Sequence, residues 1–311
     1  MTGRGLRIRD AHRLLWISFG LFMLISFAAS VKPFSDWYLL DTAMGELALV
    51  IPAAIFLRRR DRDWKEVISD KPMDGRNLAF SLGVLLCAYP LLAIINMLSM
   101  LFVKNQVASA MPKLTSYGLV GMLLAVAILP AFCEEFLCRG ILFMSYSNIS
   151  PLAGALLSAL MFGLLHRNLN QFFYTVFLGL LFALMDRATG TIQSSVTMHM
   201  LLNGVDATIM YVAARRYPDT LESASQVDIR QMLFYDQDNM ATSIIAIVLV
   251  SAFFAACIAI LIRQAFKYNQ TSLKPDLPAQ EREKYGKIVD LPLILFVAVT
   301  AVLTFLGTDF L

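Results

Sequence analysis

Two adjacent glutamates and an arginine follow a long apolar run of the chain without a break. Residues 118–133 are apolar, Glu134, Glu135 and Arg139 come next, and residues 140–144 are apolar again. On a helix Glu135 and Arg139 are four residues apart and can form an ion pair, whereas Glu134 is rotated by about 100° from Glu135. Because a charged side chain inside a membrane span is costly, it is by default a candidate for function. The segment predicts a buried ion pair between Glu135 and Arg139, beside a Glu134 carboxylate that has no partner on its own helix. The alternative is that all three residues form the end of the helix among the lipid headgroups.

Two further pairs of side chains stand four residues apart on apolar helices. Phe162 and His166 share one helix face, and His199 and Asn203 share another. Each pair alone is also typical of structural contacts between neighbouring helices. A rise of about 1.5 Å per residue, counted from the predicted turns, brings the three segments to one depth, roughly 10 Å below the cytoplasmic surface. We therefore expect Glu134 to share one cluster with His166, His199 and Asn203.

A carboxylate, two imidazoles and an amide can together hydrolyse a peptide bond with water. A carboxylate held away from bulk water is suited to act as a general base, so Glu134 would take a proton from a water molecule that His166 positions. His199 and Asn203 would donate hydrogen bonds to the oxyanion of the tetrahedral intermediate. Such a donor can stabilise the transition state by about 3 kcal/mol.

Three neighbouring side chains would support this centre. Glu135 and Arg139 would anchor the helix and hold the direction of Glu134. Phe162 would pack its ring beside the imidazole of His166, since the two share a helix face.

A zinc-dependent mechanism with the same side chains is the alternative. His166, His199 and Glu134 are an acceptable three-ligand set for catalytic zinc. The sequence has no His-Glu-x-x-His zinc signature, no Gly-x-Ser-x-Gly nucleophile motif and no aspartate pair of the Gly-x-Gly-Asp type. We expect a metal-free general base and no cofactor, with zinc as the second possibility.

The composition is that of a membrane protein. Of the 311 residues, 58% are hydrophobic and only 16% are charged, against about 25% charged in soluble domains. The four cysteines lie in or beside apolar runs and resemble small hydrophobic side chains, and the net charge of +3 does not indicate a nucleic-acid partner. Since about 20 apolar residues cross a bilayer, the chain predicts an all-α bundle of 8–9 spanning helices. The candidate spans are 14–30, 39–57, 78–103, 118–137, 151–166, 171–186, 193–213, 242–262 and 291–309.

The loops differ in their content of Lys and Arg. Residues 1–13, 58–77 and 263–290 carry most of these residues, which predicts a cytoplasmic N-terminus. We interpret the first span as an uncleaved anchor, with a cleaved signal peptide ending near Ala28-Ala29-Ser30 as the alternative. The chain then forms a single integral membrane domain, 1–311, with a catalytic core at 118–213 and a flexible cytoplasmic linker at 267–287 before the last helix.

The polar residues form three short motifs, in order, on three apolar helices. The motifs are Glu134-Glu135-x-x-x-Arg139, Phe162-x-x-x-His166 and His199-x-x-x-Asn203. In order and separation they resemble the motifs of the CPBP family, which includes type II CAAX prenyl endopeptidases and bacteriocin-processing or Abi-type immunity proteins. The resemblance covers about residues 118–213. It implies an all-helical fold with an intramembrane cavity open to the cytosol, and a protease that is either glutamate-dependent or metal-dependent. By resemblance, Glu134 would be the catalytic carboxylate, His166 its partner on the water, and His199 with Asn203 the oxyanion site.

The sequence thus predicts an intramembrane endopeptidase of the bacterial plasma membrane that acts on a peptide or membrane-protein substrate. The alternative is a non-catalytic membrane protein, for immunity or transport, that binds a peptide or an ion with the same cluster. A transporter would need a second set of buried charges across the membrane, for which Asp41, Glu46 and Asp206 are the candidates.

Overall fold

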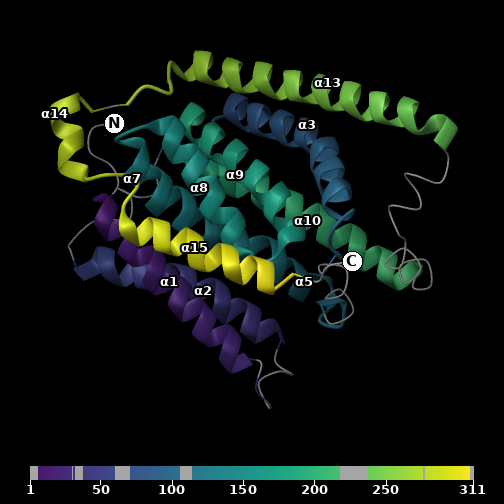
Figure 1. The fold of residues 1–311 in the computed structure, drawn as a ribbon, viewed down its shortest axis with the longest axis horizontal. Helices are drawn as coiled ribbons and strands as arrows, with labels where there is room; N and C mark the ends of the chain where they lie inside the picture. The colour runs from purple at the N-terminus through teal and green to yellow at the C-terminus, as the bar shows by residue number, and fades with distance from the viewer. Residues whose placement is uncertain are drawn as a thin grey trace.

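The computed structural model is a bundle of helices (Figure 1). The described residues are 6–29, 31, 38–59, 71–105, 114–217, 237–275 and 277–308. The first three helices are α1 (Ile8–Ala29), α2 (Tyr38–Arg59) and α3 (Gly75–Ser99). One helical stretch then joins α5 (Gly118–Leu123), η3 (Leu124–Ile128), α6 (Leu129–Glu135), η4 (Phe136–Phe143) and α7 (Met144–Ser147). The remaining helices are α8 (Pro151–Leu165), α9 (Leu169–Thr189), α10 (Gln193–Arg216), α13 (Gln237–Asn269), α14 (Ala279–Arg282), η5 (Glu283–Tyr285) and α15 (Leu291–Leu306). The predicted all-α fold is confirmed for the described residues.

Each predicted apolar run forms a helix, but not every helix meets the length and hydropathy expected of a span. Among the described residues, 6 helical segments are long and apolar enough to cross a membrane, and α8 and α15 are apolar but shorter. Helix α10, which carries His199, Asn203 and Asp206, is not among them. The predicted count of 8–9 spans is therefore approximate. Parts of the basic segments used to predict the orientation, residues 1–5 and 60–70, lie outside the described residues, as do Ser30 of the suggested cleavage site and residue 309 at the end of the last run.

Short capped turns return the chain between the helices that carry the site. The Ser150 side chain accepts a hydrogen bond from the backbone N–H of Ala153 (3.4 Å), and Pro151 follows in the first turn of α8. The Asn168 side chain caps α9 in the same way. Helix α9 ends at Gly190, whose φ of 77° is a left-handed conformation that glycine adopts without strain. These turns hold α8, α9 and α10 against one another.

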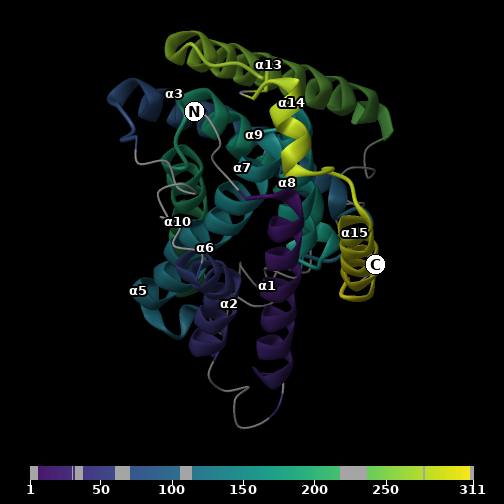
Figure 2. The same ribbon diagram turned by 90° about the vertical axis from the view of Figure 1, so that its left-hand side faces the viewer.

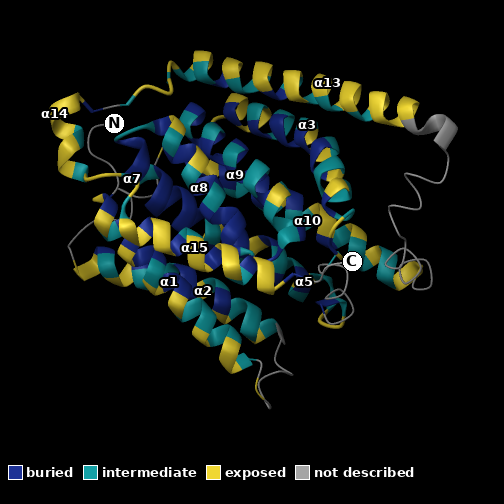
Figure 3. Cartoon of the chain, in the orientation of Figure 1, coloured by how far each residue is buried: buried dark blue, intermediate teal, exposed yellow. Residues whose placement is uncertain are grey.

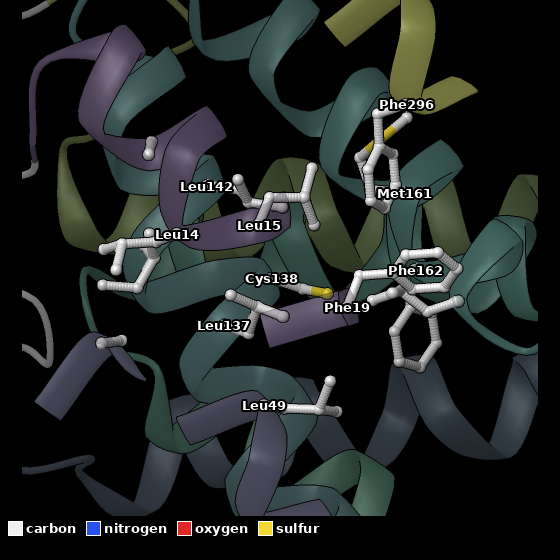
Figure 4. Packing of buried hydrophobic residues seen from close by; sticks show 14 of the residues in the cluster. Leu14, Leu15, Phe19, Leu49, Leu137, Cys138, Leu142, Met161, Phe162 and Phe296 are labelled. Carbon is white, nitrogen blue, oxygen red and sulfur yellow. The ribbon is translucent and has the colours of Figure 1, made fainter. Parts of the chain in front are cut away.

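Helices α8, α9 and α10 lie in the middle of the bundle, between α3 and α13 on one side and α1 and α2 on the other (Figures 1 and 2). Most of α8 and α9 is buried and α10 is buried mainly in its first half, whereas α13 presents exposed residues along its outer face (Figure 3). One apolar cluster joins α1, α2, η4, α8 and α15, and Figure 4 shows its packing around Leu137, Leu142 and Phe162. A second cluster joins α3, α9, α10 and α13. The helices with the motifs therefore lie between two packed layers.

The third histidine of the chain lies away from the predicted cluster and ties the last helix to the first. His12 Nδ1 lies 2.8 Å from Asp290 Oδ1, and His12 Nε2 lies 2.9 Å from the Tyr146 hydroxyl oxygen. The indole N–H of Trp16 donates to the Pro292 carbonyl. Helix α15 is thus joined to α1, and α1 to α7, by polar contacts as well as by packing.

The segment 267–287 contains more structure than a flexible linker would. Helix α13 continues to Asn269, and α14 with η5 occupies part of the remainder. The Arg187 guanidinium, at the end of α9, donates to the carbonyls of Ser272 (2.7 Å) and Lys274 (2.8 Å). The first part of this segment is therefore fixed to the helix that precedes the α9–α10 turn.

Candidate functional site

The acidic pair lies where the helical stretch changes its winding. Glu134 and Glu135 are the last two residues of α6, and the next element, η4, is a π-helix that carries Arg139. Single π-helical turns inside α-helices are frequent at functional sites. Arg139 reaches the carbonyl of Gly179 in α9, and both glutamates approach His199 in α10.

Glu135 and Arg139 form a fully buried ion pair, as their spacing predicts. Arg139 Nη1 lies 3.0 Å from each carboxylate oxygen of Glu135, and the two side chains are 1% and 0% exposed. Arg139 Nη2 also donates to the carbonyl of Gly179 at 3.0 Å. The guanidinium stacks over Phe162, 4.4 Å from the ring centroid, and lies 5.3 Å from that of Phe182. Aromatic faces and a carbonyl thus replace the water that the guanidinium loses on burial.

Gly179 allows Arg139 and α8 to approach α9 closely. A Cβ atom at Gly179 would lie 2.9 Å from the Cα of Ala159 and 3.0 Å from Arg139 Nη2. Both distances are shorter than normal contacts, so a methyl group would push α8 away from α9 and displace the guanidinium.

We therefore expect Gly179→Ala to lower the stability of the protein by about 1–3 kcal/mol, because overpacking forces neighbouring groups apart. The measurement is the midpoint of thermal unfolding of the purified protein in detergent. Gly20→Ala in α1 is the matched control, since a Cβ there has no atom within 4 Å. Equal midpoints for the two variants would show that α8 and α9 have room for a methyl group at this contact.

His199 lies between the two glutamates. Its Nδ1 is 2.9 Å from Glu135 Oε1, and its Nε2 is 3.8 Å from Glu134 Oε2. The imidazole stacks on Phe182, with ring centroids 5.6 Å apart, and meets Phe162 edge-on at 5.7 Å. Because Glu135 already pairs with Arg139, it acts as an acceptor and His199 Nδ1 as the donor. This fixes the ring so that Nε2 faces Glu134.

His166 joins the cluster through the ring of Phe162. Its Nδ1 lies 2.8 Å from the carbonyl oxygen of Phe162, and the two rings meet edge-on with centroids 5.1 Å apart. A carbonyl only accepts, so Nδ1 carries the proton, and in the neutral ring Nε2 is then an acceptor. This tautomer suits a residue that accepts a hydrogen bond from water, which is the role the sequence predicts for His166.

Asn203 makes a contact that its motif does not predict. Its amide nitrogen donates to the carbonyl of Val126 in η3 at 2.8 Å. One of the two amide hydrogens is thus used to hold α10 against η3, and the other stays available to a substrate oxygen. The amide is therefore oriented before any substrate binds.

The zinc alternative requires His166, His199 and Glu134 around one ion. In the part of the chain that the structure describes, no group of three His, Cys, Asp or Glu side chains is placed to hold a metal ion.

The acids proposed for a transport path have separate surroundings. Asp41 interacts electrostatically with Arg167, and Asp206 accepts a hydrogen bond from the Tyr89 hydroxyl. Only Glu46 interacts with the carboxyl group of Glu134. These three acids therefore do not form the continuous row of charges across the membrane that a transport path would need.

Sequence reasoning missed the contribution of α9. Phe182 and Gly179 contact His199 and Arg139 directly, although α9 carries no motif. Asp186, at the end of the same apolar run, accepts a hydrogen bond from the backbone N–H of Ser195 at 2.9 Å and so links α9 to α10. The charge of Asp186 within an apolar run was a signal that could have identified it.

The comparison with protein families matches the middle of the chain. Residues 116–205 match the family model described as type II CAAX prenyl endopeptidase Rce1-like. The matched range contains all three motifs, so the predicted resemblance is confirmed over this range. The search of curated proteins and the search of solved structures found no match.

Proposed function

We propose that this chain, whose residues 116–205 belong to the type II CAAX prenyl endopeptidase Rce1-like family, is a glutamate-dependent intramembrane endopeptidase. The family match and the apolar helices support an integral membrane protein that cuts a peptide substrate. We further propose that it resides in a bacterial plasma membrane with its N-terminus in the cytoplasm, from the distribution of Lys and Arg.

The reaction begins with a water molecule between Glu134 and His166. As the water oxygen bonds to the carbonyl carbon of the peptide, one water proton passes to Glu134, and the carbonyl π electrons move to the oxygen. His199 Nε2, in the protonated ring, and the free amide hydrogen of Asn203 donate to this oxyanion. The C–N bond then breaks, and the leaving nitrogen takes the proton from Glu134. The products are a new carboxyl terminus and a new amino terminus.

One observation carries this assignment. The two glutamates are adjacent in sequence but differ in their surroundings: Glu135 is paired with Arg139 and His199, whereas Glu134 Oε2 is shielded from solvent and has no hydrogen-bond donor among the described residues. A carboxylate that accepts hydrogen bonds from its neighbours orients them, while a carboxylate oxygen without a donor is able to take a proton from water. The separation of roles supports Glu134 as the base.

Quantitative labelling of new protein N-termini tests the proposal without knowledge of the substrate. Membranes from cells that express the wild-type chain are compared with membranes from cells that express Glu134→Gln at the same level. The proposal expects a set of membrane-associated termini that is present only with the wild type. Identical sets of termini would contradict the proposed protease.

A chelator test addresses the metal. Because the proposed reaction uses side chains alone, EDTA or 1,10-phenanthroline should leave the cleavage rate of the purified protein in proteoliposomes unchanged within about twofold. A complete loss of activity that added zinc restores would replace the general-base mechanism with a zinc-dependent one.

A further inference from the structure

Helix α10, which carries His199 and Asn203, begins without a capping residue of the usual kind. The position before its first turn is occupied by Ile192, whose side chain makes no capping hydrogen bond. The first N–H groups of an α-helix have no partner within the helix, and an aliphatic side chain cannot satisfy them. A helix that carries two residues of the site therefore depends on another part of the chain to satisfy its first turn.

The neighbouring helix supplies an acceptor for this turn. Asp186 Oδ1, in the last turn of α9, accepts a hydrogen bond at 2.9 Å from the backbone N–H of Ser195, which lies in the first turn of α10. The two residues are 7% and 0% exposed, so water does not compete for this contact. A carboxylate at a helix N-terminus also interacts favourably with the helix dipole. Asp186 therefore caps α10, although it belongs to α9.

The capping contact lies one helical turn from a contact that His199 makes. On α9, Phe182 precedes Asp186 by four residues, and on α10, His199 follows Ser195 by four. The rings of Phe182 and His199 stack with their centroids 5.6 Å apart. Four residues correspond to about 6 Å along each helix, so the two contacts are successive links between the same two helices. The bond from Ser195 to Asp186 thus sets how far along α9 the imidazole of His199 lies.

We propose that Asp186 is a positioning residue of the hydrolytic centre, which fixes α10 against α9 so that His199 keeps its place between Glu134 and Glu135. His199 now lies 3.8 Å from the first carboxylate and 2.9 Å from the second, and a shift of α10 along α9 would change both distances. A displacement of about 1 Å in a catalytic group can lower a rate by about 10²-fold. Asp186 itself forms and breaks no covalent bond. This role requires a hydrogen-bond acceptor at position 186 and does not require a charge.

The inference rests on the proposed function, so the experiment includes a variant that tests that function separately. The probe is a quenched fluorescent peptide with the residues around the most abundant Glu134-dependent cleavage site. The full chain is assayed in proteoliposomes as the wild type and as Asp186→Leu, Asp186→Asn, Glu134→Gln and Asp74→Ala. Asp74 is the matched control, because its side chain caps α3 by accepting from the N–H of Asn77 at 2.8 Å, and α3 carries none of the three motifs.

Asp186→Leu should lower kcat by about 10–100-fold with KM unchanged within about threefold, because His199 is displaced from the position in which it stabilises the oxyanion. Asp186→Asn keeps an oxygen acceptor for the N–H of Ser195 and should retain kcat within about threefold. Asp74→Ala should lower the thermal unfolding midpoint, as expected for the loss of a helix cap, and leave kcat unchanged. If Asp186→Leu does not unfold cooperatively, Asp186→Ala, which adds no volume, is measured in its place with the same expectation.

The outcomes separate the two claims. Wild-type kcat in Asp186→Leu together with no activity in Glu134→Gln overturns the role of Asp186 and leaves the protease intact. A loss of kcat in Asp186→Asn as large as in Asp186→Leu also overturns it, because the amide oxygen can still accept the hydrogen bond. An equal loss of kcat in Asp74→Ala overturns it as well, because the loss of any helix cap would then have the same effect. Full activity in Glu134→Gln, or the lack of any Glu134-dependent cleavage, overturns the proposed function and this inference with it.

Discussion

Glu134→Gln should reduce the rate of peptide cleavage by about 10²–10⁴-fold, the contribution expected of a general base. The amide has the shape of the carboxylate but cannot take a proton from water. The fold should persist, because among the described residues the one cationic group near this carboxylate is His199, whose Nε2 lies 3.8 Å away. The measurement is product formation by the purified variant in proteoliposomes, together with its thermal unfolding midpoint.

Glu283→Gln is the matched control for this result. Glu283 is an exposed acid of η5, away from the three motifs, and the same substitution there should leave the rate unchanged. If Glu134→Gln and Glu283→Gln cleave at the same rate, the base has been assigned to the wrong residue. If Glu134→Gln fails to unfold cooperatively, the lost activity cannot be ascribed to the missing base, and Glu134→Asp provides the second test of the same role.

Arg139→Met should lower the free energy of unfolding by about 3–5 kcal/mol, the largest stability effect that we expect in this protein. The reason is that removing one partner of a buried pair leaves the other charge uncompensated. Here Glu135, with 0% exposure, would keep His199 as its one hydrogen-bond partner among the described residues. Chemical or thermal unfolding of the purified protein in detergent measures the change.

The double variant Glu135→Gln/Arg139→Met separates charge from packing. With no charge left on either side chain, most of the lost stability should return. Activity should stay low, because His199 no longer faces a charged acceptor that fixes its ring. A single Arg139→Met variant that is as stable as the wild type would show that the pair does not contribute in its buried, charged form.

Local spacing explains which features the sequence could predict. Glu135 and Arg139 are four residues apart on one helix, and His166 is four residues from Phe162, so these contacts follow from helical geometry alone. The all-helical fold follows from the length and composition of the apolar runs. Depth counted along the helices also anticipates that His199 reaches the glutamates.

Contacts that depend on how helices approach one another could not be predicted. Gly179 accepts from Arg139 only because η4 lies against α9, and no motif marks α9. Asn203 bonds to a backbone carbonyl of η3, and the π-helical winding there has no clear signal in the residue types. Glu46 was visible as a charge in an apolar run, but its proximity to Glu134 depends on the packing of α2 against α6.

The role of the cluster decides between a protease and a binding protein. Both would need a polar site among apolar helices, and both would lose function if the helices were displaced. They differ in what happens to a peptide that has bound. A protease cuts the bound peptide, and a variant that lacks only the base still binds the peptide but leaves it intact. A binding protein leaves the peptide intact in both forms.

The most direct test follows one labelled peptide, carrying a Glu134-dependent cleavage site, through binding and conversion by the wild type and by Glu134→Gln in proteoliposomes. The variant is expected to bind the intact peptide with an affinity within about threefold of the wild type, while mass spectrometry detects two fragments only with the wild type. Peptide that the wild type binds but leaves uncut, or fragments formed equally by both proteins, would contradict Glu134 as the residue that activates water.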